Sequence, residues 1–180
     1  GTGELLELLS LLKDGTHGTH KDVEDGPYLL SAKNIKNGQL IINKNTDRKI
    51  STSEYNKIFS RFALQKDDIL LTIVGSIGDA TILNNVTGIA FQRSVAFLRP
   101  QIGISPKFLY AVITTEKFQL ELTARKSQSA QPGIYLGDLK KILVAFPKFN
   151  EQEKIGQLFE YVGTLITLHQ RKPLEKGGLK

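Results

Sequence analysis

Residues 137–155 read GDLKKILVAFPKFNEQEKI, an apolar segment that ends on a proline and leads directly into an amphipathic pattern. The apolar run before Pro147 is typical of a short strand, and proline cannot continue a strand ladder. Asn150 is a plausible N-cap, and Glu151 and Glu153 lie in the first turn, where the helix dipole favours acidic side chains. We therefore predict a strand followed at once by a capped helix.

The predicted helix carries an apolar stripe with repeats of three and four residues, as in the a and d positions of a coiled coil. It extends to about Lys172, with little chain after it to cover the stripe. Most amphipathic helices fold back on their own domain, and about two heptads are short for a coiled coil. The terminal position favours an external partner instead, and both interpretations stay open. The predicted interface residues are Ile155, Leu158, Phe159, Val162, Leu165 and Ile166.

The composition suits one domain of ordinary size with an appendage. Hydrophobic residues make up 40% of the 180 residues, which is enough for a core. The absence of cysteine excludes disulfide bonds and thiolate metal sites, and a reducing, cytoplasmic setting is the simplest expectation. No apolar run is long enough to cross a bilayer, so we expect no membrane contact. The chain also contains no Met, so we expect a cleaved or engineered start.

The chain is basic, with a net charge of +6 and a pI of about 9.4. Lysine and arginine neutralise phosphates and release condensed counterions, so a basic balance favours polyanionic partners such as nucleic acid. A moderately basic protein without such a partner remains the alternative.

The pattern along the chain predicts an α+β fold, a mixed, strand-rich domain at residues 1–148. A long, projecting C-terminal amphipathic helix follows at residues 149–172, and a tail at residues 173–180. Asn37-Gly38 between apolar runs is a strong hairpin signal. We expect strands at 27–35, 38–42, 69–74, 80–83 and 88–98, a short helix at 54–56 capped by Ser51 or Ser53, and one helix at 106–122.

A catalytic or metal centre finds little support in the sequence. The glycine-rich turn at residues 75–78 lacks the spacing of a dinucleotide or phosphate loop, and the common hydrolase motifs are absent. His17 and His20 have a suitable spacing for one metal on a helix, but a glycine between them indicates a loop. Asp67 and Asp68 can form a carboxylate pair, although such a pair is more often a turn that sets the entry of a strand. We therefore expect no enzyme, no metal and no cofactor.

Polar loops suit contacts with double-stranded DNA better. Hydroxyl, amide, imidazole and guanidinium groups can hydrogen-bond to base edges, while lysines and loop amides can hold phosphates. Arg93 is the sharpest candidate for a bidentate contact to guanine; the alternative is an ordinary surface arginine at a strand end. The predicted DNA-contacting residues are Thr16, His17, Thr19, His20, Lys21, Lys33, Asn34, Ser76, Gln92, Arg93, Ser94, Arg125, Lys126, Ser127, Gln128, Gln131 and Tyr135.

Five stretches in a fixed order carry a family resemblance. They are KNI at 33–35, KDDILLTIVGSIG at 66–78, AFQRSVAFLRP at 90–100, SAQPGIYLGDLKK at 129–141, and VAFP at 144–147 followed by NEQEKI at 150–155. From about Gly3 to Lys172 the chain resembles a target recognition domain and the adjoining conserved-region helix of a type I restriction–modification specificity subunit. No single stretch is diagnostic, but the ordered set is specific.

The resemblance implies a non-catalytic DNA reader. Members of the family hold two such domains, each reading one half of a split target, with conserved helices as the spacer. They bind modification subunits, which methylate adenine with S-adenosylmethionine, and restriction subunits, which cleave DNA. This chain departs from the pattern with one recognition domain and one helix, and residues 173–180 break the longer helix that we would expect. A half-length subunit or a fragment is therefore expected, and two copies that pair through their helices would call for a palindromic split site.

Two other hypotheses compete with DNA reading. The chain can be a protein-interaction adaptor that docks on a modification complex through its helix without reading DNA itself. It can also be an enzyme of an unrecognised type, which would need a buried polar cluster that the sequence does not show.

Overall fold

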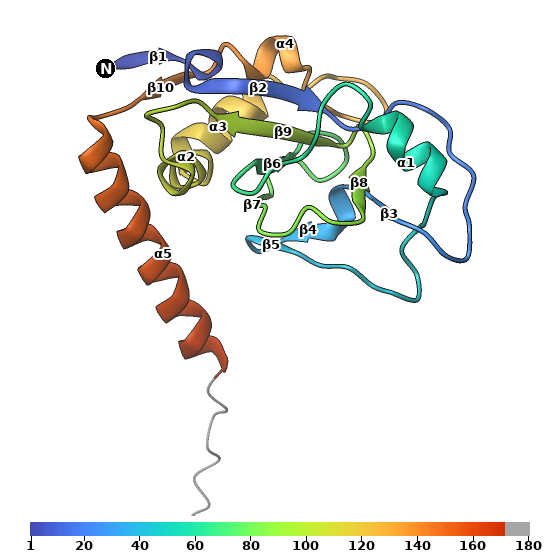
Figure 1. The fold of residues 1–180 in the computed structure, drawn as a ribbon. Helices are drawn as coiled ribbons and strands as arrows, with labels where there is room; N and C mark the ends of the chain where they lie inside the picture. Colours follow the sequence, from blue (N-terminus) through green and yellow to red (C-terminus); the bar gives the residue numbers. More distant parts are fainter. Residues whose placement is uncertain (172–180) are drawn as a thin grey trace, which may run out of the picture.

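The computed structural model describes residues 1–171. The predicted tail at 173–180, and the break in the helix expected there, lie outside the described residues. The predicted α+β fold is confirmed: a mixed domain of short strands and helices is followed by one long helix that leaves it (Figure 1).

A four-stranded antiparallel sheet forms the centre of the domain, with strand order β2-β9-β6-β7. Side chains alternate between its two faces, as the pleat requires. In β9, Ala96 and Leu98 face one apolar cluster, whereas Val95 and Phe97 face another. The sheet is therefore buried on both sides. Its strands are β2 (Leu9–Asp14), β6 (Ile69–Thr72), β7 (Ala80–Ile82) and β9 (Val95–Pro100).

Two helices cover one face of the sheet where we predicted a single helix over 106–122. The structure has α2 (Pro106–Ile113) and α3 (Glu116–Ala124). The Thr115 hydroxyl accepts a hydrogen bond from the amide of Phe118 and so caps a new helix. The single-helix prediction was wrong because a local side-chain cap interrupts an apolar pattern that continues across it.

Three two-stranded pairs surround the central sheet. They are β1 (Thr2–Glu4) with β10 (Leu143–Ala145), β3 (Tyr28–Leu30) with β8 (Ile89–Phe91), and β4 (Ile35–Lys36) with β5 (Gln39–Leu40). The β4–β5 hairpin confirms the Asn-Gly prediction, since Asn37 and Gly38 have φ of 52° and 73°. Helix α1 (Thr52–Ile58) is capped by Ser51, as one of the two alternatives held. The remaining short elements are the 3₁₀ turns η1 (Leu5–Leu8) and η2 (Ala32–Asn34), and α4 (Leu136–Leu139).

Two predicted strands are interrupted. Residues 27–35 hold β3 and then the η2 turn, where Ser31 and Asn34 cap each other. Residues 88–98 hold β8 and β9, separated by a turn at 92–94. In the first place the Asn34 side chain accepts from the Ser31 amide. In the second, the amides of Gln92 and Arg93 donate to the carbonyls of Leu30 and Thr16, which belong to other segments.

The Asp67-Asp68 pair is structural, in agreement with the interpretation that it forms a turn at the entry of a strand. Asp67 lies in a turn with φ of 71°. Asp68 is fully buried, and its carboxylate accepts two hydrogen bonds from the Arg99 guanidinium, at 2.7 and 2.8 Å. A bidentate pair of this kind neutralises both charges and fixes the entry to β6.

Helix α5 is Phe149–Arg171, so it begins before Asn150, the predicted N-cap. The carbonyl of Lys148 accepts from the amides of Glu151 and Gln152. Asn150 therefore lies inside the first turn and is not the N-cap. Within the described residues, no helix combines the length and apolar character that crossing a membrane requires.

The base of α5 docks on α2 through a small and polar face. The buried Gln152 side chain accepts from the amide of Ser105 at 3.0 Å and donates to the carbonyl of Pro147 at 3.0 Å. One turn later, a Cβ on Gly156 would lie 2.7 Å from the Lys107 Cβ. Lys107 of α2 also pairs with Glu160 at 2.6 Å, and farther along, the helix leaves the domain (Figure 1).

This docking yields a prediction about the two glycines of α5. Replacing Gly156 with Ala should lower the free energy of unfolding by about 1–3 kcal/mol, because the new methyl group forces α5 away from α2. Gly163→Ala is the matched control, since nothing lies within 4 Å of its Cβ position, and removing a helical glycine is mildly favourable. Urea unfolding compares the two, and equal effects would contradict the docking contact.

Candidate nucleic-acid interface

Two loops far apart in sequence meet where β2 ends and β9 begins. The amide of Thr16 donates to the carbonyl of Phe91 at 2.8 Å, and the amide of Arg93 donates to the carbonyl of Thr16 at 3.1 Å. A Cβ on Gly15 would lie 2.2 Å from the Phe91 oxygen, which is far inside van der Waals contact. Only glycine at this position allows the 14–22 loop to close against the 92–94 turn.

Side-chain hydrogen bonds hold the 14–22 loop in place. The Thr16 hydroxyl and His20 Nε2 are 2.8 Å apart, and His20 Nδ1 lies 3.4 Å from the Glu54 carboxylate of α1. The Arg48 guanidinium donates to the His20 carbonyl and also pairs with Asp22. The loop that was predicted to contact DNA is therefore a preorganised surface.

Arg93 projects from the turn between two core strands. Its side chain is exposed, and its guanidinium makes no hydrogen bond or ion pair with any residue of the described chain. Arg48 and Arg99, in contrast, pair with Asp22 and Asp68. An arginine that the fold leaves free on a fixed backbone suits an external anion or base edge.

A pocket of about 430 Å³ brings part of the predicted set together. Ile73, Val74 and Ile134 form apolar walls of the pocket. An antiparallel β-bridge joins Val74 to Gly133, and both residues line the pocket. Asp14 also reaches the pocket and binds the His17 ring at 2.6 Å. The predicted residues that line it are His17, Arg93, Ser127, Gln131 and Tyr135.

Other predicted residues lie around this pocket without lining it. The turn that carries Ser76 adjoins the 127–133 loop, since the amide of Gly75 donates to the carbonyl of Pro132. Ser94 is half-buried, and its hydroxyl accepts from the amide of Ala32. Gln92 is also half-buried, whereas the exposed side chains are those of Thr19, Lys21, Ser76, Lys126 and Gln128.

Three predicted residues are bound by partners within the chain. Asn34 is buried, and its amide group donates to the Ile41 carbonyl and to Asp47. Lys33 pairs with Asp47 at 2.9 Å, and Arg125 pairs with Glu121 one turn earlier. Lys33 and Asn34 stabilise the β4–β5 hairpin and Arg125 stabilises α3, so we do not include these three residues in the proposed DNA interface.

The Asp47 carboxylate shows how tightly the hairpin network is bound. Burial alone raises the pKa of a carboxyl group. Hydrogen bonds from the Asn43 amide, Lys33 and Asn34, together with the Lys33 charge, outweigh that effect and hold the pKa of Asp47 below its ordinary value. Its stabilising contribution is therefore present at neutral pH and is lost as the pH falls through the lowered pKa.

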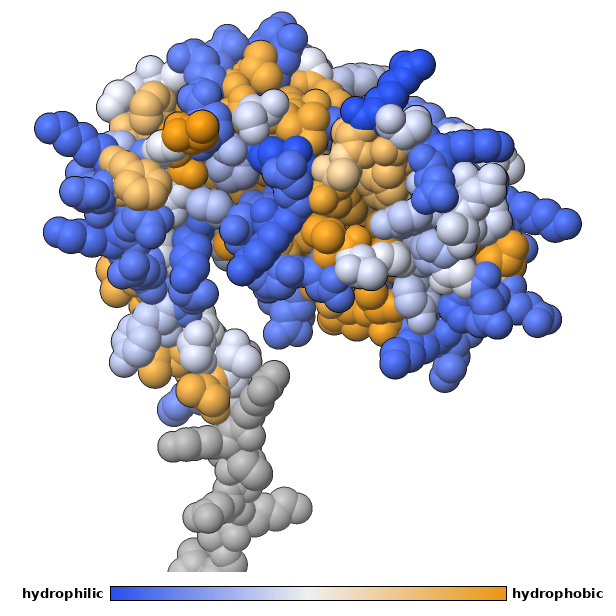
Figure 2. All heavy atoms as spheres, in the orientation of Figure 1, coloured by the Kyte–Doolittle hydropathy of each residue, from blue (hydrophilic) through white to orange (hydrophobic). Residues whose placement is uncertain are grey.

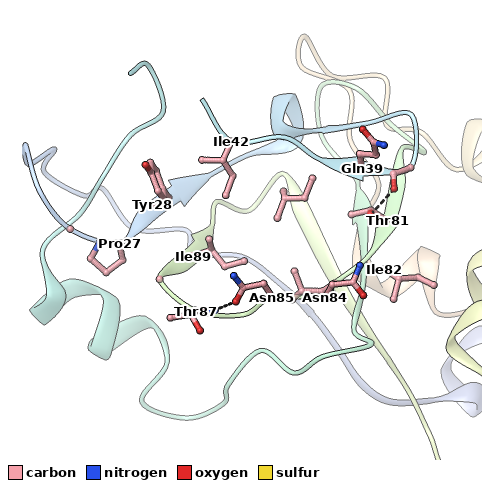
Figure 3. Close-up of a pocket in the computed structure, with 15 residues that line it drawn as sticks. Pro27, Tyr28, Gln39, Ile42, Thr81, Ile82, Asn84, Asn85, Thr87 and Ile89 are labelled. Atoms are coloured by element: carbon pink, nitrogen blue, oxygen red, sulfur yellow. Dashed lines mark hydrogen bonds between the residues drawn. The ribbon is translucent and has the colours of Figure 1, made fainter. Parts of the chain in front are cut away.

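A larger cavity, of about 810 Å³, lies between the β4–β5 hairpin and β7 (Figure 3). Thr81 donates to the Gly38 carbonyl beside it, and Asn84 and Asn85 contribute amide groups. Among the described residues that line it there is no charged side chain and no member of the predicted set. The described lining of this cavity therefore offers no cationic side chain for a phosphate group.

The described part of the chain holds no group of three or more side chains that could bind a metal ion. The two neighbouring histidines have other partners, His17 with Asp14 and His20 with Thr16 and Glu54. The pairing of His20 with Glu54 was missing from the predictions because 34 residues separate them. Asp14 gave a weak signal, since it directly precedes the polar loop.

Comparisons with known proteins give the family of the chain. Residues 11–175 match the family model described as type I restriction modification DNA specificity domain. The type I restriction enzyme EcoBI specificity subunit of Escherichia coli is 32% identical over 149 residues, which cover 80% of this chain and 31% of that protein. The chain thus spans about a third of the length of this curated relative.

Solved structures support the fold. A chain from a structure on complex assembly and conformational transition of the type I restriction–modification system matches with a TM-score of 0.70 at 15% identity, over 95% of this chain and 40% of that one. The HsdS subunit from Thermoanaerobacter tengcongensis matches with a TM-score of 0.63 at 13% identity, over 95% of this chain and 39% of that one. At these identities the likeness establishes the architecture alone.

The contact between the two loops yields a prediction. Gly15→Ala should lower the free energy of unfolding by about 1–3 kcal/mol or prevent folding. The new Cβ would clash with backbone atoms of Phe91 and Gln92, which cannot move aside as a flexible side chain can. Gly18→Ala is the control in the same loop, since its Cβ would meet only the tip of the His20 ring, at 3.2 Å. Thermal unfolding followed by circular dichroism measures both variants, and equal melting temperatures would refute the close approach at Gly15.

Proposed function

Because this chain belongs to the type I restriction–modification DNA specificity family, we propose that it reads one half of a split DNA target within a specificity subunit. The observation that carries this proposal is Arg93. It is exposed, free of partners in the described chain, and fixed on the turn that Thr16 holds in place. A preorganised guanidinium of this kind suits a bidentate contact to guanine O6 and N7.

The groups around Arg93 divide naturally into two roles. Arg93, Thr16 and Gln131 can reach base edges, since they offer directional donors and acceptors. The exposed Lys21 and Lys126 suit phosphate contacts, which position the protein without carrying sequence information. Residues 1–148 form the recognition domain in this proposal, and residues 149–172 form the spacer helix.

The proposed partners are double-stranded DNA, the modification subunits and the restriction subunit. The chain itself carries recognition, and the partner subunits supply methylation and cleavage. The proposed location is the cytoplasm, where those partners meet DNA.

The long helix supports a second copy as an additional partner. Gln152 and Gly156 dock α5 on its own domain. Phe159, Val162 and Ile166 line a groove that also includes Tyr110 and the β4–β5 hairpin, but each of the three stays at least 45% exposed, so the apolar stripe is not buried by folding back. Apolar side chains remain at the surface along the helix (Figure 2). Leu158 is 64% exposed and Leu165 47% exposed. Two chains that pair along this stripe would present two recognition domains with two-fold symmetry.

The same stripe supports the alternative, an adaptor that docks on a modification complex without reading DNA. Salt dependence separates the two, because a chain that neutralises phosphates loses DNA affinity steeply as salt rises. The direct test of DNA reading is selection from randomised duplexes by the full chain with a modification subunit present. If no sequence outcompetes bulk DNA, the DNA-reading proposal fails and the adaptor function is favoured.

Arg93→Ala should weaken binding to the selected duplex by about 1–3 kcal/mol and relax the preference at one base pair, because one bidentate contact is lost. Arg93→Lys retains the charge and loses the fork, so it should restore bulk affinity without the base preference. Competition binding with each base substituted in turn measures both effects. An unchanged preference at every position in Arg93→Ala would remove this residue from the readout.

The double variant Leu158→Asp and Leu165→Asp should dissociate a self-associated species, because buried carboxylates without partners oppose apolar pairing. The control is Gln157→Asp with Thr164→Asp, which adds the same charge at other exposed positions of α5. Multi-angle light scattering gives the mass of each. If the mass is the same in the wild type and both variants, the stripe does not pair two copies.

A further inference from the structure

Three side chains from two elements form a hydrogen-bonded chain beside Arg93. Glu54 of α1 faces His20 Nδ1 at 3.4 Å, and His20 Nε2 faces the Thr16 hydroxyl at 2.8 Å. The His20 side chain is 11% exposed and that of Glu54 27% exposed. The imidazole therefore lies between a carboxylate on one side and a hydroxyl on the other.

This order of groups selects one tautomer. An ionised carboxylate accepts hydrogen bonds and has no hydrogen to donate. In its neutral form, His20 therefore carries its hydrogen on Nδ1, which leaves Nε2 as an acceptor. The only hydrogen available between Nε2 and the Thr16 oxygen is then that of the hydroxyl group. Thr16 donates it inward, to the histidine.

The hydroxyl of Thr16 consequently has no hydrogen left for an external ligand. Its oxygen already takes a weak contact from the Gly18 amide, at 3.3 Å, and keeps one lone pair. The backbone of Thr16 is held against Phe91 and Arg93 by the two hydrogen bonds that join the loops. The orientation of this group is thus set from both its backbone and its side chain.

We propose that Glu54 and His20 fix Thr16 as a hydrogen-bond acceptor, so that Thr16 recognises the exocyclic amino group of an adenine or a cytosine in the target. These amino groups are the donors that base pairs offer in the major groove, whereas N7, O6 and O4 are acceptors that this hydroxyl cannot serve. The inference rests on the proposed DNA-reading function. His20 and Glu54 act as positioning residues and touch no base.

The tautomer is tested without DNA. Long-range proton–nitrogen NMR spectra of the ¹⁵N-labelled full chain at neutral pH should show His20 protonated at Nδ1 and unprotonated at Nε2. The signals of His20 are assigned by their absence in the His20→Gln variant. Glu54→Leu removes the acceptor and should shift His20 away from this form. A wild-type His20 protonated at Nε2 would overturn the proposal, whatever the chain does with DNA.

The reading role is tested on the selected duplex. Removing the amino group at one position, with purine for adenine or the 4-deamino analogue for cytosine, should weaken binding roughly two- to tenfold, the size of one neutral hydrogen bond. Thr16→Ser should keep this sensitivity, whereas Thr16→Val, which has the same shape without the hydroxyl, should lose it. Where that base is a purine, replacing its N7 by carbon should change the binding of Thr16→Ser and Thr16→Val by the same factor.

The outcomes separate the two claims. If the wild type selects a sequence but Thr16→Val responds to every amino-group deletion as the wild type does, only the role of Thr16 fails. If the wild type selects no sequence, DNA reading fails and the role of Thr16 fails with it.

Discussion

The contact of backbone with backbone at Gly15 is the constraint on which the proposed interface depends. Strands β2 and β9 pair in antiparallel register up to Asp14 and Ala96, so the loop after one strand must pass the turn before the other. With no side chain at residue 15, the Thr16 amide reaches the carbonyl of Phe91 at the end of β8, and the Thr16 carbonyl reaches the amide of Arg93 in the 92–94 turn. This approach fixes Arg93, orients Thr16 and builds one edge of the pocket. A larger residue would separate the loops and disperse the groups that are proposed to meet DNA.

The sequence predicted the features that local chemistry determines. Asn37-Gly38 demands the positive φ angles of a tight hairpin, the apolar run at 69–74 reads as a buried strand, and the stripe of α5 follows from its period. It failed where tertiary contacts or caps decide. Thr115 starts a new helix in the middle of an apolar pattern. Asn34 has the residue type of a base reader but is consumed by Asp47 and the Ile41 carbonyl. Glu54 carried no signal at all, because only folding brings α1 to His20.

The long helix illustrates how one element can serve two surfaces. Its first turns use Gln152 and Gly156, a buried amide and a residue without a side chain, to grip α2. A packing contact made by a buried amide and a glycine uses little of the apolar surface of the helix. The larger apolar residues therefore stay at the surface, where they can pair with another helix. The packing at Gly156 sets the direction in which the helix leaves α2. In the proposed reading of a split target, this packing would set the spacing of the two halves.

A structure of the full chain bound to its selected duplex would show whether the joined loops meet DNA through Arg93. We expect the 14–22 loop and the 92–94 turn to face one groove, with the Arg93 guanidinium donating two hydrogen bonds to a guanine edge. We also expect Asn34 and Arg125 to keep their internal partners. A duplex bound to another surface, with Arg93 in solvent, would show that these loops do not read DNA.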